Sequence, residues 1–274
     1  MQASINENMK FSIDEKRNMS IELFAKYEKG EWFKNLSSKA EIIHRSLWAV
    51  TIRDQNYIYK AFYYKNLEKI KQEILLLNLM GKIKAELNID NQNDFIYSKA
   101  KYLELKDLEK DCSVEWLYRQ LKGIFNRWLC DKRFIQGVKC TWESESLPYM
   151  IYVLHTYLPG SERYIDYLRK SKPVQFIHGD FTISNIKIIK NELIVLDFEL
   201  STIGPELWDE ETFLYSLVEA ELYELADKMF ELLGCTKEGV ACIAAIKLAI
   251  AYKKESNIKK REKAFKYITE TKWR

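Results

Sequence analysis

The sequence has few residues of the two types that most often shape turns, with 9 glycines and 4 prolines in 274 residues. No glycine occurs between Gly30 and Gly81, so that part of the chain lacks a glycine-rich loop of the kind that cradles phosphate groups. No run of about 18 apolar residues occurs, so we expect no transmembrane helix. Residues 1–8 are polar overall, so we expect no secretory signal.

Neither the cysteines nor the net charge favours a zinc site or a nucleic-acid polymer as partner. The five cysteines are odd in number and form no C-x-x-C pair, which argues against a zinc site and a disulfide framework. Reduced thiols are typical of the cytoplasm, where we expect the protein. The 43 Lys and Arg residues against 40 Asp and Glu leave a net charge of +3, which is too small to indicate nucleic-acid binding.

Residues with strand character gather in the first part of the chain. Apolar residues make up 47% of the sequence, enough for one large domain or two lobes. Three short runs rich in β-branched and aromatic residues predict an antiparallel meander at residues 41–45, 48–53 and 57–63. Further expected elements are helices at residues 13–29 and 66–80 and a strand pair at residues 95–97 and 101–105.

Helices dominate the second part, where a hairpin at residues 186–196 is the only clear β element. The charged tail at residues 253–274 predicts a solvated amphipathic helix rather than a binding arm. Strands first and helices later indicate an α+β protein with two lobes, residues 1–104 and 105–274. The expected helices of the second lobe lie at residues 114–129, 161–169, 210–233 and 239–250 or beyond.

The hairpin brings three oxygen-bearing side chains to one place. Its two apolar runs, Ile186–Ile189 and Leu193–Leu196, flank a polar turn. Asn185 precedes the first run and Asp197 follows the second, so antiparallel pairing sets them side by side, and Asp180 lies on the loop that leads there. Carboxylate and amide oxygens suit Mg²⁺, and a carboxylate suits a base for a hydroxyl. Each residue alone is ordinary turn chemistry, but the group predicts Mg²⁺-dependent phosphoryl transfer.

Three neighbours of this group admit a structural and a functional interpretation. His178 suits a catalytic base, but at the end of an apolar strand we favour a structural histidine that bonds the loop backbone. Gly179 suits a backbone conformation that a β-carbon would hinder. Glu199 is either a metal ligand or orienting group, or a surface acid after a strand, and the sequence favours neither.

Lys60 and Glu73 are a candidate ion pair in the first lobe. Alternation along the strand places Lys60 on the same face as Ile58 and Phe62, where an ammonium group needs an anionic partner. Glu73 lies on the apolar side of the next helix, beside Leu76 and residues of the same stripe. A Lys60–Glu73 pair, with the lysine also reaching phosphates, satisfies both charges. The alternative is a lysine whose charged end extends to solvent from an edge strand.

These residues together resemble a known family. The segment His178-Gly179-Asp180-x-x-x-x-Asn185, followed by Asp197-Phe198-Glu199, is similar to the aminoglycoside phosphotransferase and choline kinase group, whose members share the two-lobed protein-kinase-like fold. The resemblance is specific over residues 176–209 and moderate over residues 57–80. It implies a small antiparallel-sheet lobe that binds nucleotide, with an extra N-terminal helix, and a mainly helical lobe for catalysis and substrate.

The resemblance also implies ATP and Mg²⁺ as cofactors and a role for each residue. Asp180 is the implied catalytic base, and Asn185 and Asp197 hold Mg²⁺ against the phosphates. Lys60 binds the phosphates and Glu73 positions it. Asp209 matches the acid that braces the catalytic loop.

Two departures from the family pattern concern the nucleotide and the substrate. The turn that covers the nucleotide lacks the usual glycines; we place it at residues 44–46, with Ser46 as a candidate phosphate ligand, or at residues 37–38. The second lobe is small, so substrate specificity is expected to be unusual.

The leading functional hypothesis is an ATP- and Mg²⁺-dependent phosphotransferase acting on a hydroxyl of a small molecule, sugar-like or aminoglycoside-like. One alternative is a non-catalytic kinase-like module that binds a nucleotide or partner; another is a kinase acting on a protein or surface glycan. Gly179 favours a substrate other than choline under the resemblance. The acidic residues from Glu206 to Glu224 either attract a cationic substrate or are solvated helix charges.

Overall fold

The structure is a computed structural model, and its described residues are 36–45, 49–62, 67–90, 95–108, 112–271 and Trp273. The chain forms two compact units, residues 1–104 and 105–274. The helix expected at residues 13–29 and the side chain of Ser46 lie outside the described residues. Within those residues, no helix has the length and apolar character needed to span a membrane.

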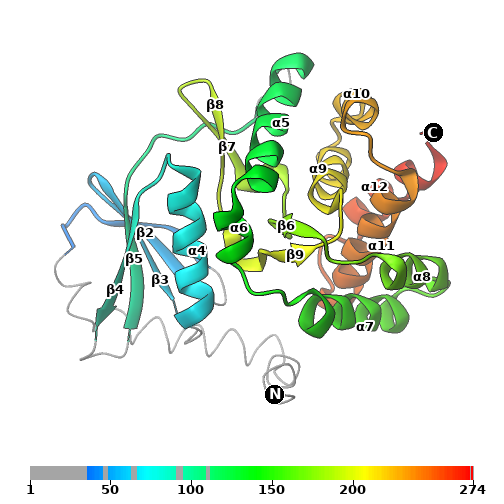
Figure 1. Cartoon of the computed structure of the whole chain (residues 1–274), viewed down its shortest axis with the longest axis horizontal. Coiled ribbons are helices and arrows are strands. Elements are labelled where there is room, and N and C mark those ends of the chain that lie inside the picture. The colour runs from blue at the N-terminus through cyan, green and yellow to red at the C-terminus, as the bar shows by residue number, and fades with distance from the viewer. Residues whose placement is uncertain are drawn as a thin grey trace. The chain divides into compact units, whose positions relative to one another are not determined.

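The first unit contains a five-stranded antiparallel sheet in the order β1-β2-β3-β5-β4, with a helix against one face (Figure 1). The meander and the helix lie where the sequence predicts them, but the strand expected at residues 101–105 is wrong. Ala85, Leu87 and Ile89 alternate with polar residues, so this earlier segment pairs with β5 instead. The elements are β1 (Glu41–Arg45), β2 (Ala49–Asp54), β3 (Tyr57–Phe62), α4 (Leu67–Met80), β4 (Ala85–Asp90) and β5 (Phe95–Lys101).

Side chains on the two faces of this sheet pack into separate clusters. Val50, Ile52 and Ala61 are buried together on one face. On the other face, Ile70 and Ile74 of α4 pack on Ala85 and on β5 residues. Because side chains alternate along β3 and Ala61 faces the first cluster, Lys60 belongs to the α4 face.

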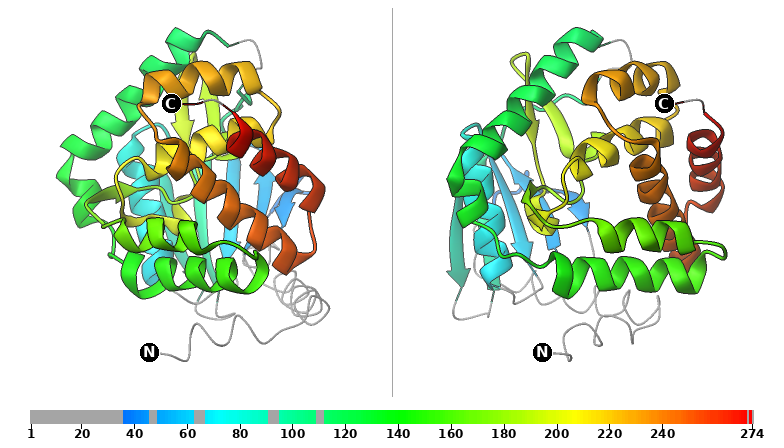
Figure 2. Two further views of the ribbon diagram at one scale, coloured as in Figure 1. Left: turned by 90° about the vertical axis from the view of Figure 1, so that its right-hand side faces the viewer. Right: turned by 45° about the vertical axis from the view of Figure 1, so that its right-hand side comes forward.

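The second unit is mainly helical, and α11 lies at its centre, in contact with α7, α8, α9 and α12 (Figure 2). The single helix expected at residues 210–233 is two helices, because the chain turns at Glu221, whose φ is 62°. Helices α6 and α7 were not expected from the sequence. The helices are α5 (Val114–Cys130), α6 (Lys132–Gln136), α7 (Leu147–Tyr157), α8 (Glu162–Lys170), α9 (Trp208–Glu219), α10 (Tyr223–Leu233), α11 (Lys237–Lys254) and α12 (Ile258–Glu270).

Two small antiparallel sheets accompany these helices. The predicted hairpin is present as β7 (Ile186–Ile189) and β8 (Glu192–Val195). The expectation of no other β element in this half is wrong, because β6 (Gln175–Ile177) pairs with β9 (Thr202–Gly204). Strands of three residues carry too few alternations to be recognised by pattern.

Helix α5 offers a matched test of the core in the second unit. Leu121 is 0% exposed and Leu129 is 53% exposed on the same helix. We expect Leu121→Ala to lower the free energy of unfolding by about 2–5 kcal/mol, because it removes packed methyl groups and leaves a cavity. Leu129→Ala should change it by less than about 0.5 kcal/mol. Urea unfolding followed by circular dichroism measures both, and equal effects would contradict the described packing.

Candidate active site

The hairpin places Asn185 and Asp197 at the same end. Ile186 pairs with Val195, and the N–H of Leu196 donates to the Asn185 carbonyl at 2.9 Å. The turn at the opposite end uses positive φ at Lys190 and Asn191, 47° and 63°, as a tight two-residue hairpin turn requires. Leu196, directly outside β8, therefore lies opposite Asn185, directly outside β7, and Asp197 follows one residue beyond this end of the hairpin.

Asp180 is tied to this end of the hairpin through Asn185. The Asn185 Nδ2 donates to the Asp180 carbonyl at 2.9 Å and to its Oδ2 at 3.3 Å. Both of these bonds use the amide nitrogen of Asn185. Within the described part of the chain no hydrogen bond to the Asn185 Oδ1 is present, so this oxygen can accept another ligand. The structure thus brings Asp180 and Asn185 together and orients the amide between a carboxylate and the hairpin.

Asp197 has a left-handed backbone, with φ 63° and ψ 63°, at the start of the short 3₁₀ helix Phe198–Leu200. Phe198 is buried and its ring centroid lies 4.8 Å from that of His178. The Asp197 side chain is exposed, and so is that of Glu199 two residues later. An apolar anchor in the core therefore fixes the segment while two carboxylates face outward.

His178 has a structural position. It is fully buried, its Nε2 donates to the Leu196 carbonyl at 2.8 Å, and its Nδ1 accepts the N–H of Asp180 at 3.3 Å. Only a neutral imidazole satisfies both bonds, and burial lowers the pKa of His178. The ring joins the loop before Asp180 to the end of β8 and has no bond left for a substrate.

Asp209, at the start of α9, holds the same loop from the other side. Its Oδ2 accepts the N–H of His178 at 2.6 Å and its Oδ1 accepts the N–H of Gly179 at 3.0 Å. Burial raises the pKa of Asp209 to about 8, although these two bonds oppose the rise. Gly179 has φ +85°, and a Cβ there would collide with the carbonyl oxygen of Leu200, so no other residue fits this turn without strain.

Lys247 is the residue that the sequence analysis missed. Its Nζ lies 2.7 Å from the Asp180 Oδ1, with side-chain exposures of 25% and 31%. Burial raises the pKa of Asp180, but the Lys247 ammonium outweighs it, so the pKa lies below its ordinary value. The available signal was a lone lysine in the otherwise apolar run Val240–Ala251, which points to a buried stem with a charged partner.

The first unit contains the predicted ion pair. Lys60 Nζ lies 2.7 Å from the Glu73 Oε1, with side-chain exposures of 24% and 6%. Ser46 lies outside the described residues. Ser37, in the alternative phosphate turn, donates its N–H to the Asp54 Oδ2 at 3.0 Å and its hydroxyl to Oδ1. Those donors are engaged within the lobe. The turn expected at residues 44–46 is wrong for its first two residues, because His44 and Arg45 belong to β1 and pair with Thr51 and Val50.

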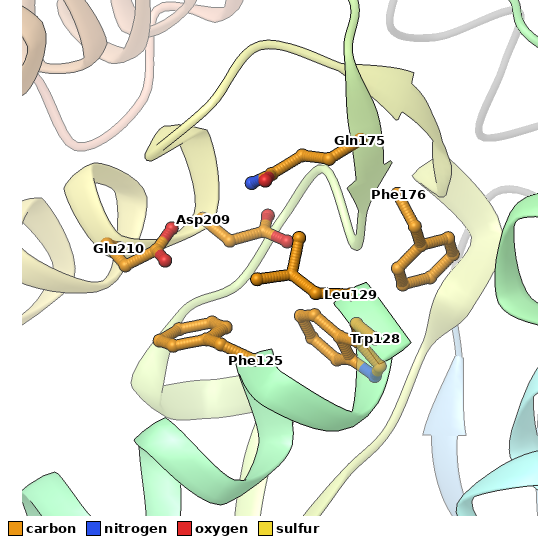
Figure 3. Close-up of a pocket in the computed structure, with 7 residues that line it drawn as sticks. All are labelled: Phe125, Trp128, Leu129, Gln175, Phe176, Asp209 and Glu210. Atoms are coloured by element: carbon orange, nitrogen blue, oxygen red, sulfur yellow. The ribbon is translucent and has the colours of Figure 1, made fainter. Parts of the chain in front are cut away.

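A small pocket lies next to Asp209 and Glu210, at the start of α9 (Figure 3). Asp180, Asn185 and Asp197 do not line it, so it is separate from the hairpin end. The Glu210 Oε2 is buried without a hydrogen-bond partner among the described residues, and burial raises the pKa of Glu210 to about 7. The lining residues are Phe125, Trp128, Leu129, Gln175, Phe176, Asp209 and Glu210.

Glu210 makes the stability of the second unit depend on pH. The ordinary pKa of 4.5 applies to the unfolded chain and about 7 to the folded one, so the folded state loses stability as pH rises between these values. We expect Glu210→Gln to raise the free energy of unfolding by about 1–2 kcal/mol at pH 8 and to change it little at pH 4. Denaturant unfolding at both pH values measures this, with the exposed Glu231→Gln as control. A gain that is equal at both pH values would contradict it.

Comparisons with known proteins match the stretch of chain that contains this site. Residues 139–240 match the model of a phosphotransferase enzyme family, APH. The match includes the Asp180 loop, the hairpin and Asp209, and it ends before Lys247. It confirms the predicted resemblance and the predicted enzyme class, a phosphotransferase. No relative is found among curated proteins.

Solved structures with a similar fold cover nearly the whole chain. An amicoumacin kinase in complex with AMP-PNP, Ca²⁺ and Ami has a TM-score of 0.64 at 12% identity, over 89% of this chain and 95% of its own. The GDP complex of an aminoglycoside 2′-phosphotransferase-IIIa mutant gives 0.60 at 13%, over 92% and 96%. A choline/ethanolamine kinase family protein from Mesorhizobium loti gives 0.55 at 12%, over 93% and 96%. These likenesses confirm the predicted kinase-like fold.

Proposed function

We propose that the protein is an ATP- and Mg²⁺-dependent phosphotransferase that moves the γ-phosphate to a hydroxyl of a small molecule. The observation that carries this proposal is the bonding of the Asp180 carboxylate to Asn185 at the end of the hairpin that also carries Asp197. A base, an amide oxygen and a second carboxylate are the groups that such a transfer requires. The family match over the same residues supports it.

Asp180 is the proposed base for the acceptor hydroxyl. Lys247 and Asn185 occupy one position on each carboxylate oxygen, and a carboxylate has about four acceptor positions. The hydroxyl therefore has room to donate to Asp180. In the transfer, the acceptor oxygen bonds to the γ-phosphorus, the bond to ADP breaks, and the hydroxyl proton passes to Asp180. A carboxylate of low pKa suits this role, since a loose transition state needs orientation more than a strong base.

Asn185 and Asp197 are the proposed protein ligands of Mg²⁺. The Asn185 Oδ1 and the exposed Asp197 carboxylate are oxygen donors, which fits a hard cation. No group of three or more His, Cys, Asp or Glu among the described residues would hold a metal alone, and Mg²⁺ commonly takes its other ligands from phosphates and water. When bound, the ion would neutralise charge on the phosphates.

Lys60 is the proposed phosphate ligand of the first unit, with Glu73 as its positioning residue and Ser46 as a further ligand. The short Lys60–Glu73 bond fixes the ammonium group on the α4 face of the sheet. ATP is the proposed donor because the amicoumacin kinase was crystallised with AMP-PNP, an ATP analogue. A nucleotide donor suits the cytoplasmic location expected from the sequence.

The acceptor is proposed to be sugar-like or aminoglycoside-like, by analogy with the named ligands and enzymes of the similar structures. One observation favours a second candidate, a non-catalytic nucleotide-binding module: the absence of glycine between Gly30 and Gly81. Both candidates bind a nucleotide, but only the phosphotransferase transfers phosphate to an acceptor, so a turnover assay separates them.

Asp180→Asn tests the proposed chemistry. We expect transfer from Mg-ATP to the best acceptor in a panel of sugars and aminoglycosides to fall at least about 100-fold in kcat, with nucleotide binding retained. Asp166→Asn, an exposed aspartate of α8, is the matched control and should leave the rate unchanged. Equal rates in wild type and Asp180→Asn would contradict the proposal. Nucleotide binding without turnover across the panel would favour the module.

Asp197→Asn tests the metal site. Loss of one anionic ligand should weaken the Mg²⁺-dependent part of ATP binding by about 10-fold or more, with a smaller effect on binding in EDTA. Fluorescence titration with a labelled ATP analogue over a Mg²⁺ series measures this. Asp107→Asn, an exposed aspartate that pairs with the half-buried Lys187, serves as control. A Mg²⁺ dependence that is the same in Asp197→Asn and wild type would refute the assignment.

A further inference from the structure

The ammonium group of Lys247 is next to the position where an acceptor hydroxyl would meet Asp180. Its Nζ lies 2.7 Å from the Asp180 Oδ1, and a hydroxyl bonded to the same carboxylate would lie about 2.7 Å from it. The Lys247 ammonium group and the acceptor hydroxyl, both bonded to the Asp180 carboxylate, are thus neighbours. A positive group of the substrate close to the reacting hydroxyl would meet a like charge at short range, in a site partly screened from water.

Lys247 is held in place by its surroundings. The neighbouring residues on its helix face, Ala244 and Ala251, are small and buried, which leaves room for the lysine stem. Arg261 of α12 donates from Nη1 to the Lys247 carbonyl at 2.7 Å and from Nε to the Glu219 Oε1 at 3.0 Å. Arg261 therefore ties α12 to the turn of α11 that carries Lys247, and Glu219 offsets the positive charge of Arg261.

Three of the seven acidic residues between Glu206 and Glu224 are engaged inside the helical unit, and a fourth forms an exposed ion pair. Of the seven acids considered for this purpose between Glu206 and Glu224, four make bonds with other parts of this unit. These bonds join Asp209 to the N–H groups of His178 and Gly179, Glu211 to Thr236, Glu219 to Arg261, and Glu221 to Lys263. A patch built to bind a polycation would leave such carboxylates open, and here Asp209, Glu211 and Glu219 are used in folding instead.

We infer that Lys247 selects between the two proposed acceptor classes: it favours a sugar or polyol whose groups beside the reacting hydroxyl are neutral or anionic, and it disfavours polycationic aminoglycosides. The inference rests on the proposed function, because it needs Asp180 to bind the acceptor hydroxyl. Selection of this kind acts through an unfavourable contact with the wrong substrate as much as through a favourable one with the right substrate.

The test compares wild type with Lys247→Met and Lys247→Glu, each saturated with Mg²⁺ and AMP-PNP. Isothermal titration with kanamycin measures binding of a polycation. We expect weak binding to wild type, at least 3-fold tighter binding to Lys247→Met and at least 10-fold tighter binding to Lys247→Glu, with the gain reduced by added salt. Lys228→Met, an exposed lysine of α10, should bind kanamycin as wild type does.

A second measurement uses matched sugars that differ in one group: glucose, glucosamine and glucuronate. The ratio of kcat/KM for the neutral or anionic sugar over glucosamine should fall at least 10-fold in Lys247→Met for any set that wild type phosphorylates. If Lys247→Glu does not fold, as judged by its melting curve, Lys247→Met decides the comparison alone.

The two ideas fail in different ways. Kanamycin binding that is as tight in wild type as in the folded Lys247 variants overturns the inference, whether or not any acceptor is phosphorylated. Undiminished transfer in Asp180→Asn overturns the proposed function instead. Preference of wild type for glucosamine over glucose would also overturn the inference while leaving phosphotransfer intact.

Discussion

The backbone N–H groups of His178 and Gly179 both donate hydrogen bonds to the buried carboxylate of Asp209. A carboxyl group buried at 2% exposure is costly unless it is hydrogen-bonded, and the two N–H groups would be equally costly without an acceptor. Each side therefore requires the other, and the pairing fixes the path of the chain into Asp180. The left-handed turn at Gly179, the bonds of the His178 ring and the position of Asn185 all follow from that path.

The sequence predicted the parts of this arrangement that rest on short-range patterns. Alternation gave the hairpin and its neighbours Asn185 and Asp197, and it placed Lys60 on the face that meets Glu73. The split between α9 and α10 could not be predicted in this way, since Glu221 adopts φ 62° without a glycine or proline to mark the turn. The β6–β9 pair was missed because each strand is only three residues long.

Lys247 was missed for a different reason. Its partner Asp180 is 67 residues earlier in the chain, and no local periodicity links a helix residue to a loop at that distance. The apolar run around Lys247 indicated that its stem is buried, but burial alone does not identify the acidic residue with which a lysine pairs. The acidic residues near Glu211 show the converse limit, because their clustering in the sequence says nothing of how many are used inside the fold. Charge patterns become informative about ligands only after internal pairs are known.

The Lys247–Asp180 bond joins two stretches of chain that differ in what they share with known phosphotransferases. The family match ends at residue 240, within the first turn of α11, so Asp180, the proposed base, lies inside the matched stretch and Lys247 lies outside it, in a part of the chain where only the fold is similar to the solved structures. In a protein divided in this way, the chemical step and the choice of acceptor can change independently over evolution. Exchange of the last two helices between distant proteins of this fold would then be a route to new acceptors that leaves the proposed reaction centre around Asp180 untouched.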